Sequence, residues 1–406
     1  MAGPDEYKWT FKARFRRNAF GWKSQPAIQR VKEAVAEIKK IARQDFLLGA
    51  EGAVLFLERV SPALDQVDGS SGAIGNAVRH AVEALVPIIE AAPATYATRN
   101  AWLERLWEAT EQDGRPWIEA LDPHWGELCA APEIASMWAD RLLDWVREDW
   151  SAPPETRAYF RGATHCLASL FRAGRNEEIL ELLALKTYSF WWYDAWGVKA
   201  LAAMGKVDEA IRYAGAHLGL NDNPSEATRL CEKILLDQGR SEEAYRSYGY
   251  EANQCTTNLA TFRSIQKKYP GKPSGVILDD LVARTPGDEG KWFAAAKDAG
   301  LYREAIDLAN RTPCDPRTLT RAARDFVFKQ PSFALHCGFA ALKWLVEGYG
   351  YDITSADVWE AYRRTMEAAG NLGEVEKTQK AIRDLVARET FGGCFVTGVL
   401  RQELGL

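Results

Sequence analysis

A glycine is followed four residues later by a glutamate, at the start of a new apolar run, five times along this chain of 406 residues. The pairs are Gly174/Glu178, Gly205/Glu209, Gly239/Glu243, Gly300/Glu304 and Gly370/Glu374. Glycine has no Cβ, so it takes the left-handed conformation that ends a helix at little cost. A glutamate in the first turn of the next helix offsets the partial positive charge of that helix end. The pattern therefore predicts a series of helical hairpins.

The intervals between these glycines are 31, 34, 61 and 70 residues, so the two long intervals each predict a further, degenerate unit. Gly271 lies where the first hidden turn is expected, and a helix starting near Pro331 fills the second gap. About seven hairpins are expected over residues 155–390. The period and the small-residue turn resemble tetratricopeptide-like repeats, although Trp196 and Gly205 are spaced more widely than in that consensus. The resemblance implies an all-α fold, an α-solenoid of stacked helical hairpins.

The part of the chain before the repeats follows a different helical pattern. From Pro26 the apolar residues recur at spacings of three and four, which predicts an amphipathic helix. Similar patterns predict helices over residues 46–60, 73–89, 96–110 and 134–146. Two prolines at the end of Ser151-Ala-Pro-Pro154 disfavour a continuous helix there. We therefore expect a basic aromatic arm (1–25), an N-terminal helical region (26–150), the repeats (151–390) and a C-terminal tail (391–406).

Composition limits the class of protein. With 47% apolar and 26% charged residues the chain can bury a large core. It has no run of 18 apolar residues and no apolar signal core after its basic start, so we expect neither a membrane span nor a secretory signal. Its seven cysteines include no CxxC pair and are widely scattered, which favours reduced thiols in a cytoplasmic protein.

The N-terminal arm is basic and aromatic. Residues 1–44 hold eleven Lys or Arg against four Asp or Glu, although the whole chain has a formal charge of −5. From Tyr7 to Arg16 aromatic and basic or polar residues alternate, which is the period of a strand. In one interpretation the aromatic residues pack on the first helices while the charges stay in water. In the other, Lys12, Arg14, Arg16, Arg17, Trp22 and Lys23 contact single-stranded nucleic acid, for which basic and aromatic side chains are needed together.

The sequence contains little that indicates catalysis. The chain has no GxSxG, P-loop, HExxH or GxGxxG sequence. His124, Glu127 and Cys129 place three metal-ligand types within six residues, but a lone cluster without a distant partner favours a structural role. The adjacent pairs His165-Cys166 and His336-Cys337 are expected at core or subunit-facing positions. We therefore predict no catalytic residue, no metal and no cofactor.

The chain is also rich in tryptophan, with 15 in all. Phe190-Trp-Trp-Tyr-Asp-Ala-Trp196 concentrates five large rings at the head of one repeat. Most such rings fill the seams between helices, but a few on an exposed face could anchor a partner. Trp191, Trp192 and Tyr193 are the candidates for that role.

Three segments, Phe15 to Ser24, Glu289 to Gly300 and Cys314 to Phe326, resemble those of a group of uncharacterised bacterial helical proteins. That resemblance implies a bacterial, cytoplasmic protein and no particular mechanism. The sequence as a whole predicts a non-catalytic binding scaffold for a protein or peptide partner. The alternatives are a nucleic-acid-associated protein that uses the basic arm and an enzyme whose site is assembled from distant residues. The oligomeric state does not follow from the sequence.

Overall fold

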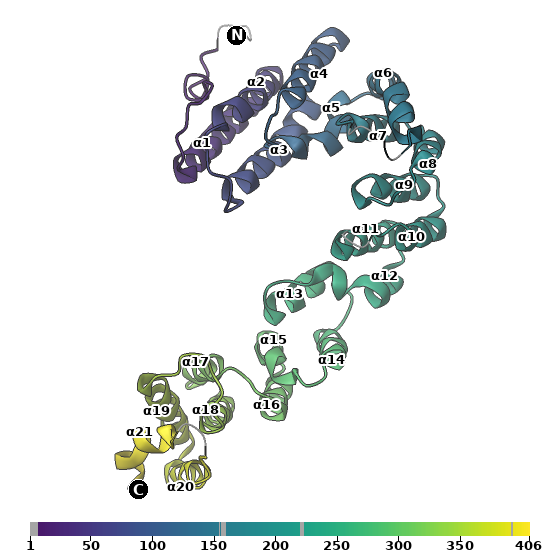
Figure 1. Ribbon diagram of the computed structural model, residues 1–406. Coiled ribbons are helices and arrows are strands. Elements are labelled where there is room, and N and C mark those ends of the chain that lie inside the picture. Colours follow the sequence, from purple (N-terminus) through teal and green to yellow (C-terminus); the bar gives the residue numbers. More distant parts are fainter. Residues whose placement is uncertain (1–6, 154, 156–159, 220–222, 391–392) are drawn as a thin grey trace. The chain divides into compact units, whose positions relative to one another are not determined.

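The computed structural model describes residues 7–153, 155, 160–219, 223–390 and 393–406. In this part of the chain the protein is all-helical, with 72% helix, 21 α-helices and no strand (Figure 1). None of these helices is both long and apolar enough to span a bilayer. The chain divides into two compact units, Met1–Ile234 and Leu235–Leu406.

The described residues of the first unit begin with ten α-helices and one 3-10 helix. They are α1 (Ser24–Ala42), α2 (Phe46–Leu64), α3 (Ala73–Ala91), α4 (Tyr96–Glu111), η1 (Glu119–His124), α5 (Trp125–Cys129), α6 (Pro132–Ser151), α7 (Ala163–Arg172), α8 (Asn176–Leu185), α9 (Trp191–Ala203) and α10 (Val207–Ala216). The next helix, α11 (Pro224–Asp237), extends over the division between the units. The five predicted N-terminal helices are confirmed as α1, α2, α3, α4 and α6. The short pair η1 and α5 was not predicted, because neither is long enough to show a helical period.

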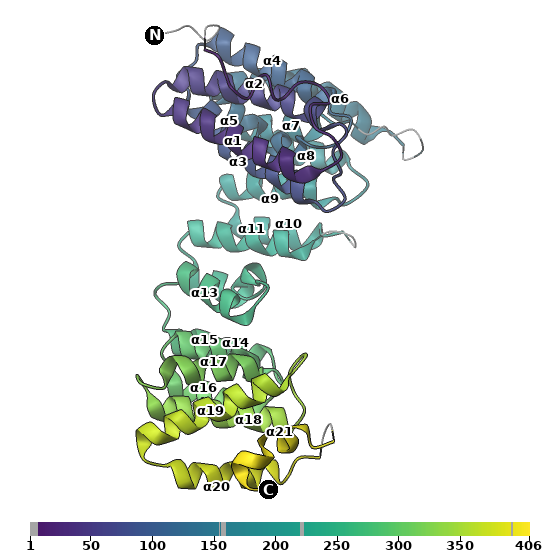
Figure 2. The same cartoon turned by 90° about the vertical axis from the view of Figure 1, so that its left-hand side faces the viewer.

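One hydrophobic core runs through the first unit from the arm to α9. Helices α1, α2 and α3 pack on one another, and α4 packs on α2 (Figure 2). The same core continues through α5, α6 and α7, where Trp125, Trp138 and Trp150 are among its largest buried side chains. Because α6 packs on both α7 and α8, packing is continuous across Ser151. Pro154 of the predicted boundary lies outside the described residues, and the boundaries proposed from the sequence stay predictions.

The second unit continues with α12 (Ser241–Tyr248), η2 (Glu251–Asn253), α13 (Asn258–Lys268), α14 (Ser274–Arg284), η3 (Glu289–Trp292), α15 (Phe293–Asp298), α16 (Tyr302–Arg311), α17 (Pro316–Phe326), α18 (Pro331–Val346), α19 (Ser355–Leu372), α20 (Val375–Val386) and α21 (Phe395–Leu404). From α17 onward each helix packs on the next helix and on the next but one. Gly271 lies between α13 and α14, and α18 begins at Pro331, as the sequence predicted. The expected C-terminal tail includes helix α21, which packs on α19 and α20, while residues 391 and 392 of that tail lie outside the described ones.

The predicted glycine turns are present and share one geometry. Gly174, Gly205, Gly239 and Gly300 have φ angles of 76°, 78°, 72° and 75° and each follows the end of a helix. The N–H of the residue after each glycine donates to the carbonyl five residues earlier, at 2.8 to 3.0 Å. This 6→1 bond defines the Schellman motif, and a glutamate then lies in the first turn of the next helix.

The fifth predicted turn is displaced by three residues. Gly370 lies inside α19, and Gly373 takes the left-handed conformation with φ 70°. The Glu374 N–H closes the same bond to the Ala369 carbonyl at 2.9 Å. The sequence holds glycines at both positions, and a spacing rule alone chose the wrong one.

The arm is not a strand, which corrects the prediction made from its alternating pattern. Residues 10–14 form turns, in which the N–H groups of Arg14 and Phe15 donate to the Phe11 carbonyl. The Glu37 side chain on α1 accepts from the N–H groups of Thr10 and Phe11 at 2.8 and 3.3 Å. A strand needs a neighbouring strand to pair its backbone groups, and the described residues offer none, so this segment pairs with itself and with a helix instead.

Candidate functional site

The aromatic residues of the arm belong to the core of the first unit. Trp9, Phe11 and Phe15 are buried. The ring of Phe56 on α2 meets Phe11 and Phe15 edge-on, with centroids 5.8 and 5.1 Å apart. The arm is thus attached to the helices by its rings, as the first of the two interpretations expected.

The basic residues of the arm stay on the surface. Lys12, Arg14, Arg16, Arg17 and Lys23 are exposed, and so is Trp22, at 70%. Arg14 Nη1 pairs with Glu33 Oε2 at 2.8 Å. Within the described part of the chain the other four cations make no ion pair. The structure therefore buries Trp9, Phe11 and Phe15 and leaves Trp22 and the five cations of the arm exposed.

The aromatic cluster of α9 is divided between core and surface. Trp191 and Tyr193 are buried, while Trp192 is 41% exposed. The indole N–H of Trp192 donates to Thr164 Oγ1 on α7 at 3.0 Å. Of these three candidates, Trp192 alone has an exposed ring.

The candidate metal ligands do not converge. His124 Nδ1 and Glu127 Oε2 are 2.7 Å apart, but Cys129 is buried in the core, where burial raises the pKa of its thiol to about 12. Across the residues that the structure describes, no group of three or more His, Cys, Asp and Glu side chains has the arrangement of a metal site. His165, Cys166 and Cys337 are buried as expected, whereas His336 is exposed.

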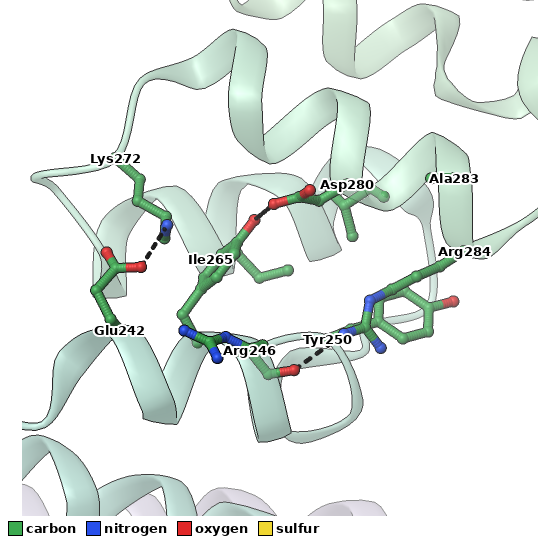
Figure 3. A pocket seen from close by; sticks show the side chains of 10 residues that line it. Glu242, Arg246, Tyr250, Ile265, Lys272, Asp280, Ala283 and Arg284 are labelled. Carbon is green, nitrogen blue, oxygen red and sulfur yellow. Dashed lines mark hydrogen bonds and ion pairs between the residues drawn. The ribbon is translucent and has the colours of Figure 1, made fainter.

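A cavity in the second unit combines an apolar floor with charged walls (Figure 3). Its volume is about 410 Å³, and it lies between α12, α13 and α14. Ile265 and Leu281 are buried and form the floor. Tyr245 and Tyr250 add two half-buried rings. The Gly239 turn leads into α12, so the geometry of this turn sets the position of the Tyr245 ring.

Interactions across the cavity hold its walls in place. The Tyr245 hydroxyl donates to Asp280 Oδ2 at 2.8 Å, which joins α12 to α14. Lys272 Nζ pairs with Glu242 Oε2 at 3.0 Å and lies 4.2 Å from the centre of the Tyr245 ring. Burial and the bond to Asp280 raise the pKa of Tyr245 above its usual value, so this hydroxyl stays protonated and is no nucleophile at neutral pH. The arrangement favours binding over proton transfer.

One cation of this cavity is unpaired. Arg284 Nη1 pairs with Glu251 Oε1 at 2.9 Å, and Arg284 Nη2 donates to the backbone carbonyl of Arg246 at 3.1 Å. The exposed guanidinium of Arg246 itself makes no ion pair or hydrogen bond with the described residues. Figure 3 shows it at the edge of the cavity on the side of Glu242, whereas the guanidinium next to the Tyr250 ring is that of Arg284. Arginine binds carboxylates through two parallel N–H···O bonds, so the Arg246 side chain is a ready anchor for an acidic group.

The sequence did not single out this cavity. Its lining residues extend from Glu242 to Arg284 along three helices, and no spacing rule joins them. One signal was available: the run Tyr245-Arg-Ser-Tyr-Gly-Tyr250 places three tyrosines beside an arginine at the end of a short helix. No protein-family model matches the chain, and no curated protein shows significant sequence similarity to it.

Proposed function

We propose that this protein is a binding scaffold for a peptide segment of a partner protein, and that the cavity of α12 to α14 takes an acidic residue next to an apolar one. The observation that carries the proposal is the unpaired Arg246 side chain, which lines the same cavity as the buried apolar residues Ile265 and Leu281. An apolar side chain would cover the floor, and a neighbouring carboxylate would bind Arg246.

We infer that this surface belongs to an α-solenoid of tetratricopeptide-like hairpins. From α7 to α20 the described residues hold fourteen α-helices, the number that seven hairpins require. The left-handed glycine turns at Gly174, Gly205, Gly239, Gly300 and Gly373 each join the two helices of one such pair. Stacked hairpins expose extended surfaces on which partners bind. The seven cysteines are all free thiols, which supports a cytoplasmic location.

The test is selection of random peptides displayed on phage against the full chain. We expect the selected peptides to carry Asp or Glu next to an apolar residue. Arg246→Glu should weaken binding of such a peptide by about ten-fold or more, because it replaces an attractive charge by a repulsive one.

Arg303→Glu is the matched control. Arg303 is an exposed arginine on α16, outside the lining of the cavity, and its reversal makes the same change in net charge. Selected peptides that bind the Arg246→Glu chain as tightly as the wild type, or a selection without a common motif, would refute the proposal.

A nucleic-acid-associated role is the second candidate. The observation that favours it is the group of exposed arm cations Lys12, Arg16, Arg17 and Lys23, which have no acidic partner among the described residues. Their phosphate contacts would show as steep salt dependence.

A further inference from the structure

A second, smaller cavity lies in the first unit, between the end of α4, the helix η1 and the segment before α7. Its volume is about 210 Å³, below the roughly 300 to 1,000 Å³ of pockets that hold drug-sized ligands. Pro116 and Glu119 on its wall are exposed, so the cavity reaches the surface there. The polar groups Glu119, Asp122 and Arg161 lie around it.

Arg161 is held in place and has donors to spare. Its Nη1 donates to the backbone carbonyls of Thr110 and Asp113, at 2.5 and 3.0 Å. Its Nε and Nη2 donate to no atom of the described residues. These two carbonyls therefore fix the Arg161 guanidinium on the cavity wall. Its edge formed by Nε and Nη2 is open to a carboxylate.

Asp122 lines the same cavity, and one oxygen of its carboxyl group, buried on the side of His165, lacks a hydrogen bond within the described ranges. Asp122 is only 4% exposed, and its Oδ1 has no hydrogen-bond partner in the part of the chain that the structure describes. Nε2 of His165, which also lacks a hydrogen bond to the described residues, lies 3.5 Å from that oxygen. A buried polar atom without a partner is costly, and a bound water, ion or ligand is one way in which native structures satisfy such an atom.

His165 does not supply a positive charge that would pair with Asp122. It is fully buried, and the rings of Trp107 and Trp125 lie 5.1 and 4.5 Å from it. Burial lowers the pKa of His165 to about 3, so the imidazole is neutral at pH 7. The third carboxylate, Asp113, already accepts from the Ser61 hydroxyl at 2.6 Å and from the Ile118 N–H at 3.0 Å. The free capacity for a cation is therefore on Asp122 and Glu119.

We propose that this cavity binds a small zwitterion of the free α-amino acid class, with its ammonium group between Asp122 and Glu119 and its carboxylate on Arg161. Acceptors and donors line one small cavity, so a ligand that carries a single charge would leave one side unmatched. The limited volume favours an amino acid with a small side chain.

Binding should release a proton. Burial, with smaller contributions from Glu119 and Asp113 and against the opposing effect of Arg161, raises the pKa of Asp122 to about 8. At pH 7 this carboxyl is mostly protonated, with the neutral His165 behind it. An ammonium group beside it stabilises the ionised form, so affinity should increase as the pH rises from about 6 to about 8.

Isothermal titration calorimetry on the full chain tests this, with glycine, L-alanine and L-serine as probes and with ethylamine and acetate as their single-charge counterparts. We expect at least one amino acid to bind and both counterparts to bind about ten-fold more weakly or worse. The measured heat at pH 7 should differ between phosphate and Tris buffers, which differ in ionisation enthalpy, because a proton is released.

Two variants and one control connect the heat to the cavity. Glu119→Gln changes an exposed side chain, so it should leave the fold intact and weaken binding about ten-fold. Asp122→Asn should weaken binding and remove the buffer dependence, whereas Glu148→Gln on the exposed face of α6 should change neither. The proposal is overturned if no amino acid binds, if acetate or ethylamine binds as tightly, or if the wild type and both variants bind equally.

Discussion

Arg99 offers the sharpest test of how the first unit is held together. It is 3% exposed, and its guanidinium donates to the Ile89 and Ala92 carbonyls at 2.5 and 2.7 Å. Two longer bonds of 3.3 Å go to the Glu90 and Leu128 carbonyls. One side chain thus binds carbonyl groups at the ends of α3 and α5, of which the Ile89 and Ala92 carbonyls also accept a backbone N–H. Arg99→Met should remove all four bonds while keeping most of the side-chain volume.

The expected loss follows from these contacts. A hydrogen bond from a charged donor contributes about 1.5 to 3 kcal/mol, so the two short bonds give roughly 3 to 6 kcal/mol. Part of this is offset, because the variant no longer buries a cation. Burial lowers the pKa of Arg99, which shows that burying its positive charge costs free energy. We expect Arg99→Met to lower the free energy of unfolding of the first unit by about 3 kcal/mol.

Urea unfolding followed by tryptophan fluorescence measures this loss. Twelve of the 15 tryptophans precede residue 235, so the signal reports mainly on the first unit. Arg79→Met on α3 is the control, because Arg79 is exposed and donates to Asn76 alone, and its loss should stay within about 0.5 kcal/mol. If Arg99→Met also stays within about 1 kcal/mol of the wild type, the guanidinium is not what holds these helix ends.

Three further predictions concern a turn, a carboxyl group and the arm. Gly205→Val forces a β-branched residue to φ 78° and should cost about 1 to 3 kcal/mol, visible as a lower melting temperature in circular dichroism; an unchanged melting temperature would count against the turn. Because burial raises the pKa of Asp122 to about 8, its carboxyl favours the fold only while protonated, so the wild type should lose stability relative to Asp122→Asn as the pH rises from about 4 to about 8; a difference in melting temperature that does not vary with pH would contradict this. For the arm we expect no retention of single-stranded nucleic acid on a filter at low salt, and near-wild-type stability when Arg14, Arg16 and Arg17 are replaced by alanine, because exposed charges contribute little; retention that falls steeply with salt and is reduced by these replacements would instead establish the nucleic-acid alternative.

The sequence was sufficient for the five long helices of the N-terminal region and for four of the five glycine turns. Helix formation and termination are local events: the apolar period of α1, the left-handed glycine at Gly205 and the glutamate of the first turn all act within a few residues. For the same reason a local rule failed where two glycines compete, at Gly370 and Gly373. It also failed in the arm, where the alternating pattern indicated a strand although no second strand is present among the described residues to pair with it.

The tertiary structure alone decided which side chains are buried and which are brought together. Trp191, Trp192 and Tyr193 are neighbours in sequence, yet their burial depends on the helices that pack around α9. Asp122 and His165 are 43 residues apart and meet only because η1 packs on α7. Cavities depend on such long-range contacts, whose partners and distances leave no period in the sequence. The sequence therefore determined the all-helical character and most of the turns of this protein, and packing determined where its cavities lie.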